Sequence, residues 1–285
     1  MSQPTIVVTG ATGNVGRRLV PLLLDAGASV RAVTRDPDSA DLPPGVSAVR
    51  ADLLEPSGLD AAFADADAVF LVWPDTSADG AGPVVDAIAG HARRVVFLSA
   101  LGVPDADPAG EAPTGLFHAR VEWLIRRTGL EWTFLRAGGF ATNTLGWADE
   151  IRSSDTVTWV YGAAGRSLIH EADIAAVAVR ALTEEGHTGA RYELTGPSVV
   201  TQTEQVRLIG EAVGREVRWV DLSEKDARER MREMGWAPEF IDSGLAHWAS
   251  IVTDPEPVTD TVEKVTGAPA RPFARWAIEH ADAFR

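Results

Sequence analysis

A strand, a glycine-rich turn and a helix follow one another at the start of the chain. Residues 5–9 are a short β-branched and apolar run, and residues 17–25 have the spacing of an amphipathic helix. Between them stand three glycines, Gly10, Gly13 and Gly16, each separated from the next by two residues. In a dinucleotide-binding βαβ unit such glycines permit the tight turn, let the backbone approach the pyrophosphate and allow close helix–sheet packing.

The helix that follows this turn offers free N–H groups and a positive dipole end to phosphates. The turn therefore predicts binding of NADP(H) or NAD(H), with cofactor contacts from Gly10, Thr12, Gly13, Asn14, Val15 and Gly16. A glycine-rich β–α turn without a ligand is the alternative, which the position between a strand and an amphipathic helix disfavours.

The end of the second predicted strand, residues 29–34, bears on the choice of cofactor. The usual NAD fingerprint has an acid here that binds the ribose hydroxyls. In this chain Arg35 is the first charged residue past the strand, and Asp36 follows it. A guanidinium can bind a 2′-phosphate with two hydrogen bonds, and Arg17 is a second candidate for that contact. We therefore expect NADP, while Asp36 keeps NAD open as the alternative.

Asp52 follows the third predicted strand, residues 46–50. Ligands of open α/β sheets bind at the carboxyl ends of the strands. Asp52 is thus a candidate acceptor for the adenine amino group, or simply the residue that ends the strand.

Apolar strands alternate with helices through the first half of the chain, with further strands expected at 68–72, 94–98 and 131–135. This alternation predicts a parallel sheet covered on both faces. After Gly146 short strand-like pieces, such as 191–195, lie among capped helices. We expect an α/β fold: a Rossmann-type, doubly wound domain in residues 1–150 and a smaller, mostly helical substrate lobe in 151–285. Part of 160–195 is expected to pack back on the Rossmann domain.

The composition narrows the class of protein. The chain of 285 residues is 45% hydrophobic, has no cysteine and carries a formal net charge of −15. Disulfides, thiolate metal sites and cysteine nucleophiles are excluded, and direct binding of nucleic acid is disfavoured. We find no apolar run long enough for a membrane span and no signal peptide, so we expect a cytoplasmic monomer or homodimer that acts on a small molecule.

A general-acid motif is missing from the chain. Short-chain dehydrogenases commonly use Tyr-x-x-x-Lys, but neither Tyr161 nor Tyr192 has Lys225 or Lys264 at that spacing. An alcohol dehydrogenase of that kind is therefore disfavoured. The proline-containing segment 101–115 also breaks the strand–helix rhythm, and is either a mobile segment beside the active cleft or a surface insertion.

The sequence resembles the NmrA-like group of atypical short-chain dehydrogenases, which includes NADPH-dependent quinone reductases and non-catalytic redox sensors. The motifs that carry the resemblance are 10–16, 33–35, 51–53, 98–100, 129–136 with Phe140 and Asn143, 169–175 and 194–197. The resemblance covers nearly the whole chain and implies the fold and the cofactor. It also implies a cofactor contact from Ser99.

The resemblance suggests a catalytic position as well. Isoflavone-reductase-like enzymes, which are more distant relatives, carry a catalytic lysine where this chain has His118, and quinone-reductase-like members tend to have histidine there. With a pKa near neutrality, His118 would hydrogen-bond the substrate carbonyl or donate a proton, and Glu122, one helical turn on, would orient it. A partly exposed His–Glu pair on the helix surface is the alternative.

Further site residues follow from the same comparison. Phe140, Asn143 and Trp147 are candidate walls of an aromatic substrate pocket, although tryptophan is more often a core residue. His170, Glu171 and Asp173 resemble a metal cluster on paper, but in this family the stretch begins a structural helix, so we expect no metal.

Three functions fit these residues. We favour hydride transfer from NAD(P)H to a quinone or a similar conjugated or aromatic carbonyl compound, because this chemistry needs little acid–base help from the protein. The alternatives are a non-catalytic NAD(P)H sensor and a non-redox tailoring enzyme on the same fold.

Overall fold

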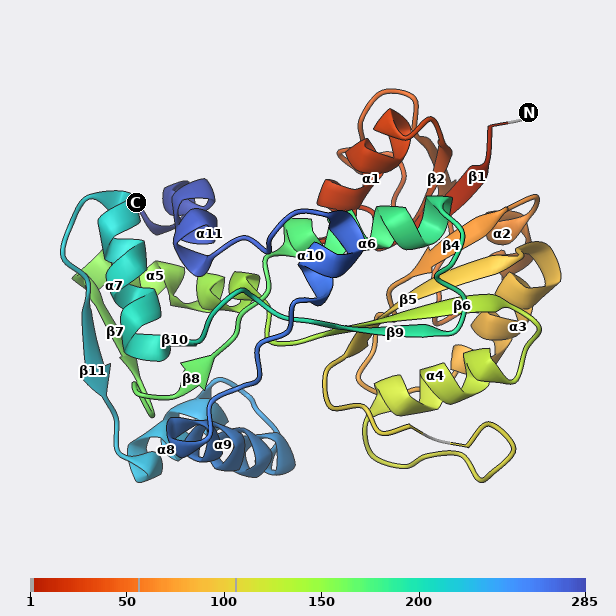
Figure 1. The fold of residues 1–285 in the computed structure, drawn as a ribbon. Coiled ribbons are helices and arrows are strands. Elements are labelled where there is room, and N and C mark those ends of the chain that lie inside the picture. Colours follow the sequence, from red (N-terminus) through yellow and green to blue (C-terminus); the bar gives the residue numbers. More distant parts are fainter. Residues whose placement is uncertain (1–2, 56, 106) are drawn as a thin grey trace. The chain divides into compact units, whose positions relative to one another are not determined.

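The computed structural model describes residues 3–55, 57–105 and 107–285 (Figure 1). The chain divides into two compact units. The first unit comprises Met1–Gly138, Glu171–Leu194 and Thr261–Ala268, and the second comprises Gly139–His170, Thr195–Asp260 and Pro269–Arg285. The N-terminal segment of the first unit ends at residue 138, whereas the sequence suggested a boundary near 150. The first unit also includes a segment within 160–195, and in addition the segment 261–268.

The first unit is built on a seven-stranded sheet with the order β3-β2-β1-β4-β5-β6-β9, in which all neighbouring strands run parallel. Its strands are β1 (Thr5–Thr9), β2 (Ser29–Thr34), β3 (Ser47–Arg50), β4 (Ala68–Leu71), β5 (Arg94–Ala100), β6 (Glu131–Ala137) and β9 (Ala190–Leu194). The central strands are buried on both faces, as a near-continuous apolar sequence requires in a parallel sheet. The expected α/β, Rossmann-type sheet is confirmed.

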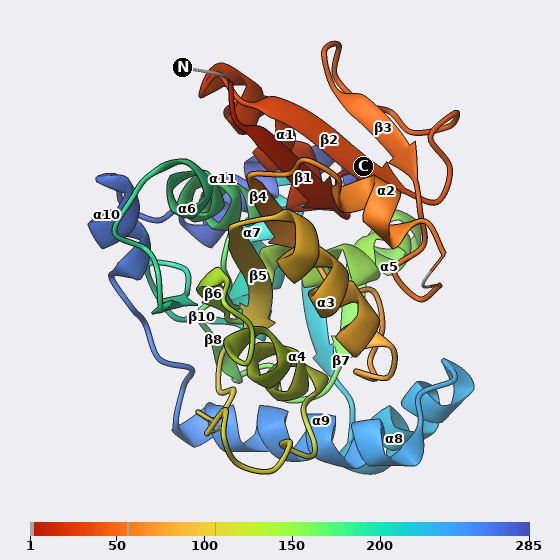
Figure 2. The same cartoon turned by 90° about the vertical axis from the view of Figure 1, so that its right-hand side faces the viewer.

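Helices cover both faces of this sheet (Figure 2). On one face α6 packs on α1, α10 and the central strands, and on the other α2, α3 and α4 form a row. Their bounds are α1 (Gly16–Asp25), α2 (Leu59–Phe63), α3 (Ala81–His91), α4 (Phe117–Arg126), α6 (Glu171–Thr183) and α10 (Thr261–Thr266).

Arg94, the first residue of β5, ties α6 to the sheet. Its buried guanidinium donates to the carbonyl oxygens of Leu182 at 3.2 Å and Glu184 at 2.8 Å, and to Glu131 at 3.2 Å. The last carbonyl groups of a helix have no partner within the helix, so this side chain satisfies the end of α6. The segment that returns from the second half of the sequence is thereby fixed to the first unit.

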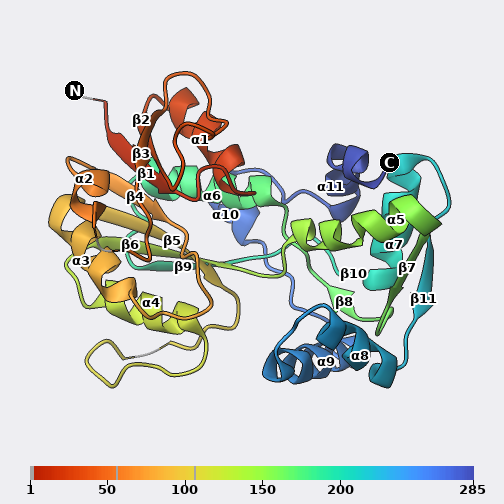
Figure 3. The ribbon, with the colours of Figure 1, turned by 180° about the vertical axis from the view of Figure 1, so that it is seen from behind.

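The second unit is mostly helical, as expected. It holds η1 (Ala141–Trp147), α5 (Ala148–Ser154), α7 (Gln202–Val213), α8 (Glu224–Glu233), α9 (Pro238–Thr253), α11 (Phe273–Glu279) and η2 (Ala281–Phe284). Two small ribbons complete it, one of β8 (Gly165–Arg166) with β10 (Val200–Thr201) and one of β7 (Thr156–Trp159) with β11 (Arg218–Asp221). Figure 3 shows α7 beside α11, where the fully buried Trp276 lies at the centre of the apolar core.

Candidate functional site

The glycine-rich turn has the tight geometry that its sequence predicts. Gly10 has a φ of +64°, and the N–H of Gly13 donates to the Gly10 carbonyl oxygen at 3.0 Å. A Cβ at Gly16 would lie 2.2 Å from that oxygen and 2.6 Å from the Cα of Ala11. Only glycine therefore allows α1 to begin so close to the strand that precedes it.

The start of α1 is open to a ligand. The helix begins at Gly16, and its N-cap residue Val15 makes no side-chain capping bond. The N–H groups of Arg17 and Arg18 already donate to the carbonyl oxygens of Gly13 and Val15, so the groups left to a ligand or to water are those of the turn itself, at residues 14–16. A phosphate is the natural partner, because the groups converge on the positive end of the helix dipole.

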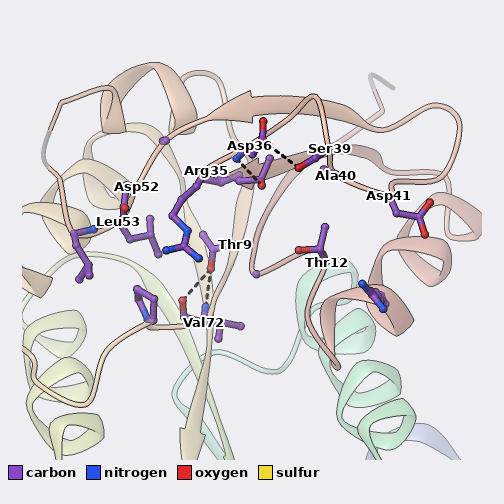
Figure 4. A pocket seen from close by; sticks show the side chains of 17 residues that line it. Thr9, Thr12, Arg35, Asp36, Ser39, Ala40, Asp41, Asp52, Leu53 and Val72 are labelled. Atoms are coloured by element: carbon purple, nitrogen blue, oxygen red, sulfur yellow. Dashed lines mark hydrogen bonds between the residues drawn. The ribbon is translucent and has the colours of Figure 1, made fainter. Parts of the chain in front are cut away.

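A pocket of about 540 Å³ opens beside this turn, at the carboxyl ends of β1, β2, β3 and β4 (Figure 4). Residues around it include Thr9, Thr12, Arg17, Arg35, Asp52 and Val72. Thr9 closes its floor, since its hydroxyl accepts from the N–H of Val72 at 2.7 Å and so joins the ends of β1 and β4. A pocket at this edge of a parallel sheet, next to a glycine turn, fits the adenosine half of a dinucleotide.

Arg35 and Asp36 lie differently in this pocket. In Figure 4 the exposed Arg35 side chain extends toward Thr9, whereas the Asp36 carboxylate lies on the side of Ser39. Asp36 accepts a hydrogen bond from the Ser39 hydroxyl at 2.7 Å and from Arg50 at 3.4 Å. The Ser39 bond, followed by the charge of Arg50, lowers the pKa of Asp36. Both residues line the pocket, but the Asp36 carboxylate is held by Ser39 and Arg50, whereas the Arg35 side chain extends toward Thr9.

Asp52 lines the pocket at the opposite wall from the glycine turn, and one of its oxygens accepts from the N–H of Leu54 at 3.0 Å. This bond fixes the carboxylate at the end of β3. A contact from Asp52 to the adenine amino group remains a prediction.

The predicted cofactor residues fall into three groups. Gly10, Thr12, Arg35 and Asp52 line the pocket, together with Arg17. The second group forms the turn beside the pocket and consists of Gly13, Asn14, Val15 and Gly16. The side chain of Val15 is buried, so only its backbone is left for contacts with a cofactor. Ser99 forms the third group, since it does not line this pocket and its hydroxyl donates to Glu122 at 2.6 Å.

Several residues that line the pocket were not predicted as site residues from the sequence, among them Ser39, Leu53 and Val72. Val72 directly follows the fourth strand, and Leu53 comes three residues after the end of the third. Their positions just past two strand ends were the available signal, because the carboxyl ends of parallel strands share one edge of the sheet.

Glu122 belongs to a buried ion pair rather than to a pair with His118. Both of its oxygens accept from Arg136, at 3.0 and 2.6 Å, and one also accepts from Ser99. Glu122 is 4% exposed and Arg136 6%. The expectation that Glu122 orients His118 is corrected here, because a buried carboxylate takes the charged partner that desolvation requires.

The Arg136 side chain of this pair also binds Asp105, which belongs to segment 101–115. Asp105 accepts from Arg136 at 2.8 Å and pairs with Arg191 of β9 at 2.9 Å, and both guanidinium groups lower its pKa against the effect of burial. Residues 112–117 line a second cavity of about 610 Å³, opposite residues 76–80 and Gly82. The segment therefore forms one wall of a hollow within the first unit.

His118 lies early on α4, as expected, but in an apolar setting. Its ring stacks on Phe117 with centroids 3.8 Å apart, and its Nδ1 is buried with no hydrogen-bond partner among the described residues. Burial lowers its pKa from 6.5 to about 4. The expected near-neutral pKa is thus corrected: the ring is neutral at neutral pH, and a neutral imidazole donates a hydrogen bond through one nitrogen only.

The predicted substrate wall lies in the second unit. Trp147, at the end of η1, meets Trp219 edge-on with ring centroids 5.9 Å apart, and the backbone of Phe140 forms a bridge with Ile169. Asn143 is exposed. A role for these three residues at the substrate remains a prediction.

In residues 3–55, 57–105 and 107–285, no three acidic or histidine side chains form a group that could hold a metal ion. No described helix has the length and apolar character needed to cross a membrane.

Fold and pocket together define a Rossmann-type protein whose pocket, at the carboxyl edge of the sheet, has the position of a dinucleotide site. Comparison with known proteins agrees, since the NAD(P)H-binding family matches residues 10–185. The chain belongs to this NAD(P)H-binding family. The resemblance to the NmrA-like, NAD(P)H-binding group of atypical short-chain dehydrogenases that the sequence indicated is confirmed.

Several similar proteins are named as reductases or oxidoreductases. The (4-alkanoyl-5-oxo-2,5-dihydrofuran-3-yl)methyl phosphate reductase of Streptomyces griseus is 37% identical over 282 residues, which cover 98% of this chain and 99% of that protein. The NAD(P)H azoreductase of Xenophilus azovorans is 35% identical, with coverage of 98% and 99%. The NADPH-dependent quinone oxidoreductase of Escherichia coli, solved with NADPH, superimposes with a TM-score of 0.76 at 24% identity over 96% of this chain and 99% of that one. This last similarity shows a shared fold.

Proposed function

We propose that this protein is an NADPH-dependent reductase that transfers a hydride to a conjugated acceptor, such as a quinone or a conjugated carbonyl compound. The observation that carries the proposal is the pocket beside the glycine turn, with Arg35 directed into it. The similar proteins support the acceptor class, because an azo compound, a quinone and an oxo-dihydrofuran ring all contain a polarised π system that accepts two electrons.

The residues present fit the cofactor. The close approach of Gly16 to Gly10 leaves no side chain between the phosphates and the start of α1. Arg35 and Arg17 line the same pocket, and a guanidinium binds a 2′-phosphate with paired hydrogen bonds. When bound, NADPH supplies the hydride and its two electrons.

His118 completes the proposed site as a hydrogen-bond donor. Since its ring is neutral at neutral pH, it donates an N–H to the oxygen or nitrogen that gains charge as the acceptor is reduced. The proton that completes the hydroquinone or alcohol then comes from solvent. Positioning rather than strong acid catalysis is the contribution of the protein, which is consistent with the missing Tyr-x-x-x-Lys motif.

The test is loss of the reduced-nicotinamide absorbance with a panel of acceptors: a benzoquinone, a naphthoquinone, an azo dye and an unsaturated lactone. Gly13→Asp introduces a negative charge at the phosphates and should abolish turnover. Gly129→Asp adds the same charge at an exposed turn with no atom within 4 Å of the new Cβ, and should retain activity. His118→Ala should lower kcat about tenfold, in the range for one lost donor to developing charge.

Two results would contradict the proposal. NADPH binding without turnover on any acceptor would favour a sensor or a non-redox enzyme, and absence of NADPH binding would exclude the reductase altogether. The cofactor preference has its own test in Arg35→Gln, which should weaken NADPH binding about tenfold or more while NADH binding stays within about twofold.

A further inference from the structure

Arg50 stands outside the pocket but touches the loop that carries Arg35. It is the last residue of β3, and the sheet register places it opposite Thr34, the last residue of β2. Its side chain therefore leaves the sheet where the loop with Arg35 and Asp36 begins. The loop is further held by the N–H of Ala51, which donates to the Thr34 carbonyl oxygen at 3.1 Å.

One guanidinium makes three contacts to this loop. Arg50 donates to the carbonyl oxygen of Arg35 at 2.7 Å and to the carboxylates of Asp36 at 3.4 Å and Asp38 at 3.1 Å. The first contact fixes the backbone of Arg35. The other two place a positive charge against two carboxylates that stand next to the proposed 2′-phosphate site.

Asp36 is the residue on which this arrangement acts. A carboxylate just past the second strand, with no partner in the protein, would accept hydrogen bonds from the ribose hydroxyls of NAD and would repel the 2′-phosphate of NADP. Here Ser39 and Arg50 both bind the carboxylate, and it points to the opposite side from Arg35 (Figure 4). The pKa of Asp36 is lowered by these contacts, so it stays charged and stays bound to them.

We infer that Arg50 is a positioning residue for cofactor specificity: it withholds Asp36 from the ribose and fixes Arg35 for a 2′-phosphate. The inference rests on the proposed preference for NADPH and names the residue outside the pocket that maintains it. Arg50 does not line the pocket and need not touch the cofactor.

If Arg50 had a purely structural role, its removal would lower the unfolding midpoint of the protein. Its side chain is 58% exposed and its partners Asp36 and Asp38 are 57% and 92% exposed. Exposed ion pairs contribute little to stability, so removing Arg50 should barely change the unfolding midpoint. Specificity and stability are thus separable readouts.

The experiment measures binding of adenosine 2′,5′-bisphosphate and of 5′-AMP by calorimetry, using the full chain. These two probes differ only in the 2′-phosphate and need no turnover. Arg50→Gln should weaken bisphosphate binding about tenfold and leave 5′-AMP within about twofold. Arg50→Lys keeps the charge but lacks the planar fork that spreads its donors over these acceptors, and it should fall between wild type and Arg50→Gln.

A double variant tests whether Arg50 acts through Asp36. In Arg50→Gln/Asp36→Asn no carboxylate remains at position 36 to repel the 2′-phosphate, so most of the lost bisphosphate affinity should return. Arg180→Gln is the matched control, because Arg180 is an exposed arginine on α6 that bonds Glu184. It should change neither affinity.

The outcomes are distinguishable. A wild type that binds both probes equally overturns the NADPH preference, and the inference falls with it. A wild type that prefers the bisphosphate, combined with an unchanged preference in Arg50→Gln, overturns the inference alone. An equal loss of affinity for both probes also overturns it, because it would mean that Arg50 only maintains the shape of the loop.

Discussion

The Cβ position of Gly16 lies 2.2 Å from the carbonyl oxygen of Gly10, well inside the distance that non-bonded carbon and oxygen atoms tolerate. The strand that precedes the turn and the helix that follows it are thus in contact through bare backbone. No flexible side chain is present to move aside, since the next nearest atoms are the Cα and carbonyl carbon of Ala11.

Gly16→Ala should therefore disrupt the site with a single methyl group. The backbone of the turn has to move, so we expect loss of NADPH binding and destabilisation of about 2 kcal/mol or more. Calorimetric titration and urea unfolding measure both effects. Gly90→Ala is the control: it lies in α3 with nothing within 4 Å of a new Cβ, and it should be neutral or stabilising by up to about 1 kcal/mol. Normal cofactor binding by Gly16→Ala would refute the argument.

Glu122→Gln should be among the most destabilising polar substitutions in the first unit. It removes the buried carboxylate from Arg136 at the end of β6 and leaves it only the exposed Asp105, and breaking such a buried pair costs about 3–5 kcal/mol. Urea unfolding at neutral pH measures the loss. Ser99→Ala removes one hydrogen bond but leaves the ion pair, so it should cost only about 1–2 kcal/mol. Glu204→Gln, in an exposed pair with Arg207, should change stability by less than about 1 kcal/mol.

The stability of the protein should depend on pH through His118. The folded pKa of about 4 lies below the ordinary value of 6.5, so between these values the unfolded chain binds more protons than the folded one. Stability due to this residue is present above pH 6.5 and is lost as pH falls toward about 4, by roughly 2–3 kcal/mol.

Chemical denaturation at a series of pH values, compared between wild type and His118→Gln, isolates this contribution. The variant should lose less stability than wild type over the same range. His91→Gln, on the surface beside Asp60, serves as the comparison and should follow wild type. Parallel curves for wild type and His118→Gln would show that His118 is not buried in solution.

Arg94→Met should loosen α6 from the sheet. The substitution leaves the end of the helix without its donor and removes one of the two arginines that bind Glu131, and we expect a loss of about 3 kcal/mol. Hydrogen exchange should show lost protection at the C-terminal end of α6. The neighbouring Arg93 is 61% exposed, so Arg93→Met should cost less than about 1 kcal/mol. Equal effects of the two substitutions would contradict a capping role for Arg94.

Local pattern was enough to predict the sheet and the turn. The strands at 5–9 and 29–34 have the expected bounds, because a β-branched run closed by glycine or a charged residue defines both ends. The pocket followed from the same pattern, since strand ends and glycines fix where the backbone is exposed to a ligand. Arg35 was found because its position after the second strand alone places it there.

Partners distant in sequence could not be predicted in this way. Part of 160–195 was expected to pack back on the Rossmann domain, but the sequence did not predict that β9 joins the main sheet beside β6. Glu122 was paired with His118 because helical spacing brings them to one face, but Arg136 comes from a strand and Ser99 from another. The pKa of His118 depends on burial against Phe117, which no spacing rule shows.

The way the chain crosses between its two units has a consequence for synthesis on the ribosome. The first unit needs the seventh strand within Glu171–Leu194 and a helix within Thr261–Ala268. Domains usually fold as they emerge, the N-terminal one first. Here the nucleotide-binding half stays incomplete until residue 268 has left the exit tunnel, and nascent chains stalled before β9 has emerged should expose the apolar β6 edge and depend on chaperones.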